Sequence, residues 1–430
     1  MAGAQATLRA PSFRRATVLI VGLFFMWGVA NNLNDLLIAQ FKKAFTLTDF
    51  RSGLVQSAFY VGYFLFAIPA SLFMRRFGYK RAIIAGLSLY GAGALLFYPA
   101  AESLRYGAFL FALFVIAAGL AFLETSANPL MTMLGPPQTA DRRLNLAQAF
   151  NPLGSITGVF FGSRVIFSNT HYTPAQLQAL TPAQLHGFRA VEARAVEAPY
   201  LVLAGVVLLW AAMTLVTRFP AIDKSQEQTA DGGFAGLLRF PRYWFGVAAQ
   251  FFYVGAQVGV WSFLIRYAQH NIPGAYEQDG ARYLTLSLAL FMTGRFAGTA
   301  LMGRISATLL TAVFAGLALL LCLVGTLAGG HTGLVALLGA SVFMSIMFPT
   351  IFSLSLRGLG PHKKAGSSFL VMAIVGGAAL PALMGRVSDG FGINAAFLVP
   401  AACFAFVLLF AATGGACAAA DEAQTAPLAA

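Results

Sequence analysis

The sequence predicts an all-helical membrane protein of twelve transmembrane helices in two bundles of six, and three observations support this. First, 58% of the residues are hydrophobic and only 10% are charged, whereas about 25% of the residues in a soluble domain are charged. Second, the apolar residues form repeated runs of roughly 20 residues, the length that spans a bilayer as a helix. Third, the basic residues behind the net charge of +13 are scattered in short connections. No basic tract is interleaved with aromatics, so nucleic acid is not an expected partner.

Twelve apolar runs are interpreted as spans. Their predicted limits are 16–41, 51–74, 81–101, 106–134, 143–168, 199–219, 241–268, 282–303, 307–329, 332–357, 365–387 and 393–414. The first run continues to about Gln40 with no small-residue cleavage site, so we expect an uncleaved span rather than a signal peptide. The predicted organisation is a tail (1–15), an N-terminal bundle (16–219), a linker (220–240), a C-terminal bundle (241–414) and a second tail (415–430).

The distribution of basic residues predicts the orientation. With the N-terminus inside, most of the 28 Lys and Arg residues fall in cytoplasmic segments, which predicts that both tails are cytoplasmic. The polar connection 169–198 is then extracytoplasmic. Six plus six spans around a central linker is typical of transporters built from two repeats, with a binding site at the midplane between them.

Two carboxylates lie inside apolar runs. The chain has only 15 acidic residues, and apart from Asp35 and Glu124 they fall in or near connecting segments or tails. A charge in hydrocarbon costs roughly 2.5–3.5 kcal/mol on insertion scales, so such residues usually face a cavity and mark a proton or substrate pathway. The two acids therefore favour a transporter.

Polar residues share one face of the first span. Trp27, Asn31, Asn34 and Asp35 follow helical spacing. Asp35 lies seven residues before Lys42, roughly 10 Å from the outer end of the helix, so protons from outside can reach it. The alternative is a buried carboxylate capped by the neighbouring Asn amides, with a role in helix packing.

Glu124 is predicted to lie near the midplane, between Arg105 and Arg142. Asn128 is one turn further on the same face, and Pro129 predicts a local break in the helix. A carboxylate at this depth can accept hydrogen bonds from several hydroxyls, which suits a sugar or polyol. The alternative is an ion pair with Arg295 of the eighth span.

Amides and one aromatic complete the predicted binding site. Gln148 and Asn151 lie three residues apart on one face of the fifth span, and Gln250, Gln257 and Trp261 form a stripe on the seventh. Amides donate and accept at once, which suits sugar ligands, and Trp261 can stack on an apolar sugar face. The alternative for these residues is interhelical packing. The five His form no metal cluster and the three Cys no disulfide framework, so neither a metal nor a cofactor is expected.

Five segments resemble one family of transporters. They are 24–35 (FFMWGVANNLND), 56–64 (QSAFYVGYF), 122–129 (FLETSANP), 145–155 (NLAQAFNPLGS) and 347–356 (MFPTIFSLSL). In these segments the chain resembles the major facilitator superfamily, and within it the fucose-galactose-glucose:proton symporter (fucose permease) family. The resemblance implies alternating access, with Asp35 as the proton-coupling residue and Glu124 as a second acid in the sugar cavity. It implies that Asn32, Gln148 and Asn151 line that cavity.

The connection between the second and third spans resembles the gating loop of the superfamily. Arg76, Gly78, Lys80 and Arg81 match its pattern, but Met74 occupies the position that is normally acidic. The salt bridge that this loop usually makes at the inward gate is therefore not expected here.

Together these observations predict a proton-coupled symporter that imports a monosaccharide such as L-fucose, galactose or glucose. We expect it to act as a monomer in the inner membrane of a bacterium, with the sugar, protons and the lipid bilayer as its partners. A sugar uniporter and a proton-coupled exporter of small amphipathic compounds remain alternatives. A nutrient receptor without transport is a third, whereas no nucleophile motif or phosphate loop supports a membrane enzyme.

Overall fold

The computed structural model describes residues 11–45, 49–134, 136–166, 181–217, 219, 233–274 and 277–425, and within them the chain forms helices and no β-strand. The helices of the first part are α1 (Pro11–Phe45), α2 (Asp49–Leu95), α3 (Phe97–Ser103), α4 (Tyr106–Met133), α5 (Ala140–Gln148), α6 (Phe150–Ile166), α8 (Pro182–Arg194) and α9 (Glu197–Val216). Those of the second are α11 (Pro241–Asn271), α12 (Glu277–Leu301), α13 (Ala307–Ala328), α14 (Gly330–Met344), α15 (Met347–Leu356), α16 (Lys363–Met372), α17 (Gly376–Phe391) and α18 (Leu398–Thr425).

The predicted all-helical class is confirmed. Among the described residues, nine helical stretches are long and apolar enough to cross a membrane. One of them, Leu54–Ser103, contains the predicted third span and all but the first three residues of the predicted second span. Helix α1 covers the predicted first span, and α5 with α6 covers the fifth up to Ile166, beyond which its last two residues lie outside the described part. The total of twelve and the side on which the termini lie stay predictions.

Contacts between helices divide the chain into two compact units. The first contains Met1–Ala127 and Phe150–Lys224, and the second contains Asn128–Ala149 and Ser225–Ala430. The second unit thus includes the end of α4 and all of α5, because α5 packs against α12 and α15. The predicted division at the 220–240 linker stays a prediction, and residues 220–232 lie outside the described part.

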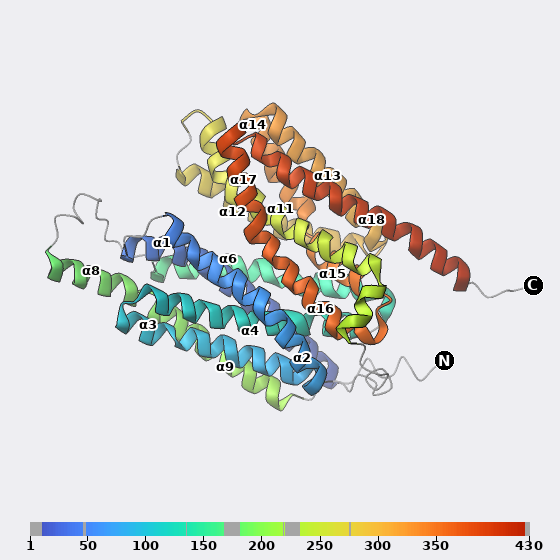
Figure 1. Ribbon diagram of the computed structural model, residues 1–430, viewed down its shortest axis with the longest axis horizontal. Coiled ribbons are helices and arrows are strands. Elements are labelled where there is room, and N and C mark those ends of the chain that lie inside the picture. The colour runs from blue at the N-terminus through green and yellow to red at the C-terminus, as the bar shows by residue number, and fades with distance from the viewer. Residues whose placement is uncertain are drawn as a thin grey trace, which may run out of the picture. The chain divides into compact units, whose positions relative to one another are not determined.

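Close backbone packing joins α1 to α6 in the first unit (Figure 1). A Cβ atom on Gly28 would lie 1.9 Å from the carbonyl oxygen of Asn151, and one on Gly154 would lie 1.9 Å from that of Phe25. Only glycine permits these two approaches. They place the polar segment of α1 beside the start of α6.

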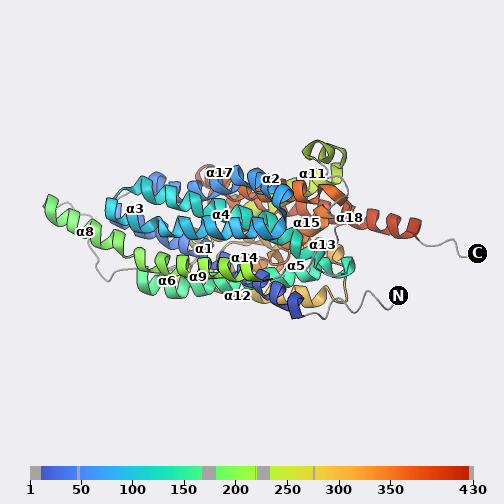
Figure 2. The same ribbon diagram turned by 90° about the horizontal axis from the view of Figure 1, so that it is seen from below.

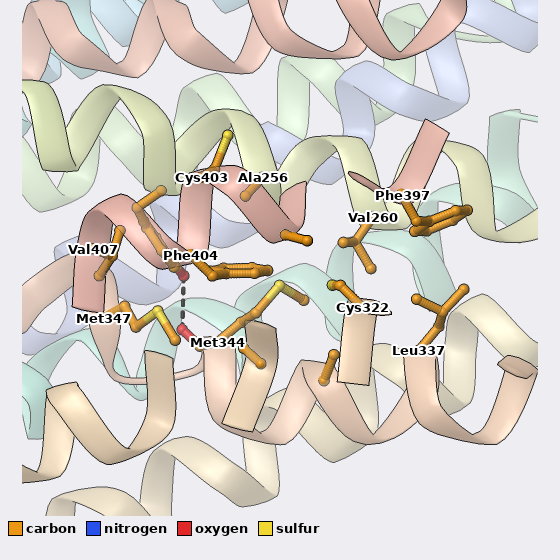
Figure 3. Packing of buried hydrophobic residues seen from close by; sticks show 14 of the residues in the cluster. Ala256, Val260, Cys322, Leu337, Met344, Met347, Phe397, Cys403, Phe404 and Val407 are labelled. Carbon is orange, nitrogen blue, oxygen red and sulfur yellow. Dashed lines mark hydrogen bonds between the residues drawn. The ribbon is translucent and has the colours of Figure 1, made fainter. Parts of the chain in front are cut away.

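The apolar core of the second unit lies among α11, α13, α14 and α18, with α18 running beside α13 (Figures 1 and 2). Figure 3 shows Cys322 facing Val260 and Leu337, and Phe404 facing Met344. Cys322 and Cys403 are buried free thiols that serve as small apolar residues.

The polar connection 169–198 is partly helical, which the sequence analysis did not predict. Helix α8 begins after a capping box in which Thr181 and Gln184 bind one another's backbone N–H groups. Its Glu192 is fully buried, and Gln40 Nε2 of α1 donates to its Oε2 at 2.7 Å. The chain therefore buries an acid at this position too, because a hydrogen bond to the carboxylate compensates for the lost water.

Candidate functional site

The polar segment of α1 is only partly described. The backbone of Asn31, Asn32 and Asp35 lies in α1, but their side chains lie outside the described residues. Trp27, one turn before them, is buried and stacks on Phe24 with 5.8 Å between ring centroids. The predicted roles of these three polar residues therefore stay predictions.

Glu124 is buried within α4, with only 1% of its surface exposed. The hydroxyl of the buried Tyr63 in α2 lies close enough to Glu124 for an electrostatic interaction. The predicted helix break at Pro129 is wrong, because α4 continues through this residue to Met133. A proline in a helix removes one N–H donor, here the partner of the Thr125 carbonyl, without always ending the helix.

Asn128 and Gln148, both predicted to bind the sugar, are joined by a hydrogen bond. Both side chains are buried, and Gln148 Nε2 donates to Asn128 Oδ1 at 2.9 Å. Asn128 Nδ2 has no hydrogen-bond partner among the described residues. A buried donor without a partner is costly, so this amide can bind a hydroxyl or a water. Asn151 is half-buried near the start of α6, and its carbonyl lies against Gly28.

Arg295 of α12 is also buried, with 3% of its surface exposed. Its Nη1 donates to the carbonyl of Gln148 at 2.9 Å, and its Nε donates to the carbonyl of Ser345 at 2.6 Å. The guanidinium lies 4.6 Å from the ring centroid of Phe291. The predicted pairing of Arg295 with Glu124 would join the two units and stays a prediction.

The predicted stripe of α11 is described in full. Trp261 is half-buried; its Nε1 donates to Ser341 Oγ at 3.2 Å, and its ring meets Phe291 edge-on at 4.9 Å. Gln257 is half-buried, whereas Gln250 is fully buried and neither of its amide atoms has a partner among the described residues. This helix thus also carries unused hydrogen-bonding groups.

The predicted gating loop lies within α2. Gly78 has φ +81°, which permits the turn between two spans that otherwise form one helix. Lys80 Nζ donates to the carbonyl of Leu215 at 2.8 Å, while Arg76 and Arg81 are exposed. Met74 is fully buried, and the absence of the usual gate salt bridge stays a prediction.

A second polar cluster, which the sequence analysis did not single out, joins α5 to α15. The buried Asp141 pairs with Arg357 and accepts a hydrogen bond from Ser353 Oγ at 2.5 Å. One turn further, Asn145 Nδ2 donates to Thr350 Oγ1 at 3.1 Å. Asp141 directly precedes two arginines and therefore reads as part of a cytoplasmic connection, so no sequence signal distinguishes it.

Apolar helices in two units, with buried carboxylates, amides and an arginine among them, define a membrane transporter. A family model described as the Major Facilitator Superfamily matches residues 18–379. The chain belongs to the Major Facilitator Superfamily, which confirms the predicted superfamily and the multi-pass membrane location.

Its relatives agree with this assignment. The chain is 49% identical over 400 residues to the L-fucose-proton symporter of Escherichia coli (strain K12), with 91% of each chain covered. It is 38% identical over 393 residues to the glucose/galactose transporter of Brucella abortus, covering 91% of this chain and 92% of that one. Among solved structures it matches the transporter FucP in the outward conformation with a TM-score of 0.87 and 46% identity, covering 94% of this chain and 99% of that chain. These relatives are transporters, and no enzyme is among them.

Proposed function

We propose that this protein is a proton-coupled symporter that imports a monosaccharide by alternating access. The observation that carries the proposal is the 49% identity, across 91% of both chains, to an L-fucose-proton symporter. The buried amides and carboxylate support it, because a hydrophilic ligand needs such groups and an exporter of amphipathic compounds needs a wide apolar cavity. L-fucose, galactose and glucose are the candidate substrates, and the protein acts as a monomer in a bacterial inner membrane.

The predicted residues divide into three roles. Asp35 takes a proton from outside, and Glu124 is the second acid, which binds the sugar and shares in proton coupling. The sugar binds among neutral side chains, assigned here to Asn31, Asn32, Asn128, Gln148, Asn151, Gln257 and Trp261. The loop at Arg76–Arg81 takes part in gating.

Proton coupling supplies the energy for accumulation. Moving one charge inward across 100 mV yields about 2.3 kcal/mol, which sustains roughly fifty-fold accumulation before any pH gradient is added. A sugar uniporter would stop at equal concentrations.

Uptake by purified protein in proteoliposomes tests the proposal. Radiolabelled L-fucose, D-galactose and D-glucose are each offered with and without an inward proton gradient. Wild-type protein concentrates one of them only with the gradient, whereas Asp35→Asn exchanges that sugar but does not concentrate it. Equal final concentrations in wild-type vesicles would identify a uniporter, and concentration by Asp35→Asn would show that Asp35 does not couple.

A further inference from the structure

The guanidinium of Arg295 binds two carbonyls that lie on different helices. One belongs to Gln148, the last residue of α5, and the other to Ser345, which directly follows α14. A charge this deeply buried is costly unless hydrogen bonds compensate it. The two carbonyls and the ring of Phe291 provide that compensation, and the sequence explains why both carbonyls are available.

Each of the two carbonyls precedes a proline by four residues. In an α-helix the carbonyl of residue i accepts from the N–H of residue i+4. The residues four positions after Gln148 and Ser345 are Pro152 and Pro349, and proline has no N–H to give. Arg295 thus provides hydrogen bonds to two carbonyls that would otherwise lack a donor, each at a point where a helix is interrupted.

The contacts of Arg295 continue to groups of the predicted sugar site. The carbonyl that it binds belongs to Gln148, whose side chain donates to Asn128. On its other side the guanidinium lies over Phe291, which packs edge-on against Trp261. Arg295 is therefore bound directly to Gln148 and is linked to Trp261 through Phe291.

We propose that Arg295 is a positioning residue, which fixes the end of α5 and the Phe291–Trp261 pair so that Gln148 and Trp261 meet the sugar in one geometry. This inference rests on the proposed function. Arginine suits the role because its planar fork donates in two directions at once and stacks on an aromatic ring. A lysine keeps the charge, but its ammonium is a point charge that does not reproduce the fork.

Counterflow kinetics of Arg295→Lys and Arg295→Gln test the proposal, with the sugar among L-fucose, D-galactose and D-glucose that wild type transports best. The KM rises about 10-fold or more in both variants, the size expected for one lost charge-assisted hydrogen bond, while Vmax per folded protein changes little. The matched control is Arg266→Lys: Arg266 also lies over a phenylalanine, Phe263, at 5.4 Å, but it is exposed on α11. Its KM stays at the wild-type value.

A merely structural role would lower the amount of folded transporter, and so Vmax, without moving the KM. Phe291→Leu provides a second variant that keeps the charge and an apolar side chain, and its KM rises about 3-fold, as expected for a lost buried cation–π contact. A third test restores the backbone N–H groups that Pro152 and Pro349 lack. In a Pro152→Ala/Pro349→Ala background the KM penalty of Arg295→Lys shrinks, because the new N–H groups take over the two carbonyls.

The outcomes separate the two levels of the proposal. If wild type transports none of the three sugars, the proposed function and this inference fail together. If wild type transports a sugar and both Arg295→Lys and Phe291→Leu keep its KM, the inference alone is wrong. An undiminished penalty in the proline-free background would also contradict it.

Discussion

Each unit of the molecule buries a charge in its polar interior, and the two charges are held in different ways. Glu124 in the first unit interacts electrostatically with the buried Tyr63. Arg295 in the second unit is bound by two main-chain carbonyls and an aromatic ring. Carbonyls can only accept, and arginine stays protonated in proteins, so Arg295 is a fixed structural charge. A carboxylate can gain and lose a proton, so Glu124 is suited to proton exchange.

The comparison predicts that removing the charge of Glu124 has the largest effect on transport. Glu124→Gln loses about 100-fold or more of the sugar uptake rate, because a carboxylate binds hydroxyl donors with charge-assisted hydrogen bonds. Uptake in proteoliposomes measures this loss. Glu192→Gln is the matched control. Glu192 of α8 is as deeply buried as Glu124, but its partner is Gln40 of α1, and neither residue is a predicted sugar ligand. If both variants lose uptake equally, burial rather than chemistry decides the effect.

The polar segment of the first unit depends on the α1–α6 contact. Gly28→Ala brings a methyl group against the Asn151 carbonyl and destabilises the protein by about 1–3 kcal/mol through overpacking. A thermal unfolding scan in detergent measures the loss. Gly205→Ala in α9 is the control, since its Cβ meets nothing within 4 Å. An unchanged melting temperature for Gly28→Ala would mean that the helices separate at no cost.

The pair of Asp141 and Arg357 tests whether the second unit holds α5 by charge as well. Arg357→Ala removes the charged partner of the buried Asp141 and leaves the hydrogen bond from Ser353, which lowers stability by about 1–3 kcal/mol. Adding Asp141→Asn recovers part of this loss, because the uncompensated charge is removed. The melting temperatures of the single and double variants measure the coupling. Strictly additive losses would show that the two residues act independently.

Part of this architecture follows from the sequence alone. Apolar runs of bilayer length predict the helices. The acids inside these runs predict a transport pathway, because a charge in hydrocarbon is costly, and the superfamily is predicted by the resemblance of the segments around Asp35, Glu124 and Gln148. The same reasoning places Glu192 in a polar connection, although the structure buries it. Local polarity does not reveal that Gln40, 152 residues away in sequence, provides its partner.

The contacts within the site could be predicted less well. The sequence predicts that Gln148 and Asn128 each bind the sugar, but their mutual hydrogen bond depends on how two helices are placed. The sequence suggests Arg295 as the partner of an acid, since opposite charges attract. Its hydrogen bonds go to two carbonyls that Pro152 and Pro349 leave without a helical N–H partner. The two prolines alone do not predict these bonds, because only the structure shows that both carbonyls lie next to the same arginine.

Proton movement during sugar entry tests the central claim most directly. Proteoliposomes are loaded with a pH-sensitive dye, and the best transported of L-fucose, D-galactose and D-glucose is added outside with no initial gradient. The account predicts that the sugar acidifies the lumen in wild type, and that Asp35→Asn abolishes this acidification while sugar exchange continues. Sugar entry into wild-type vesicles without any acidification would contradict proton-coupled symport.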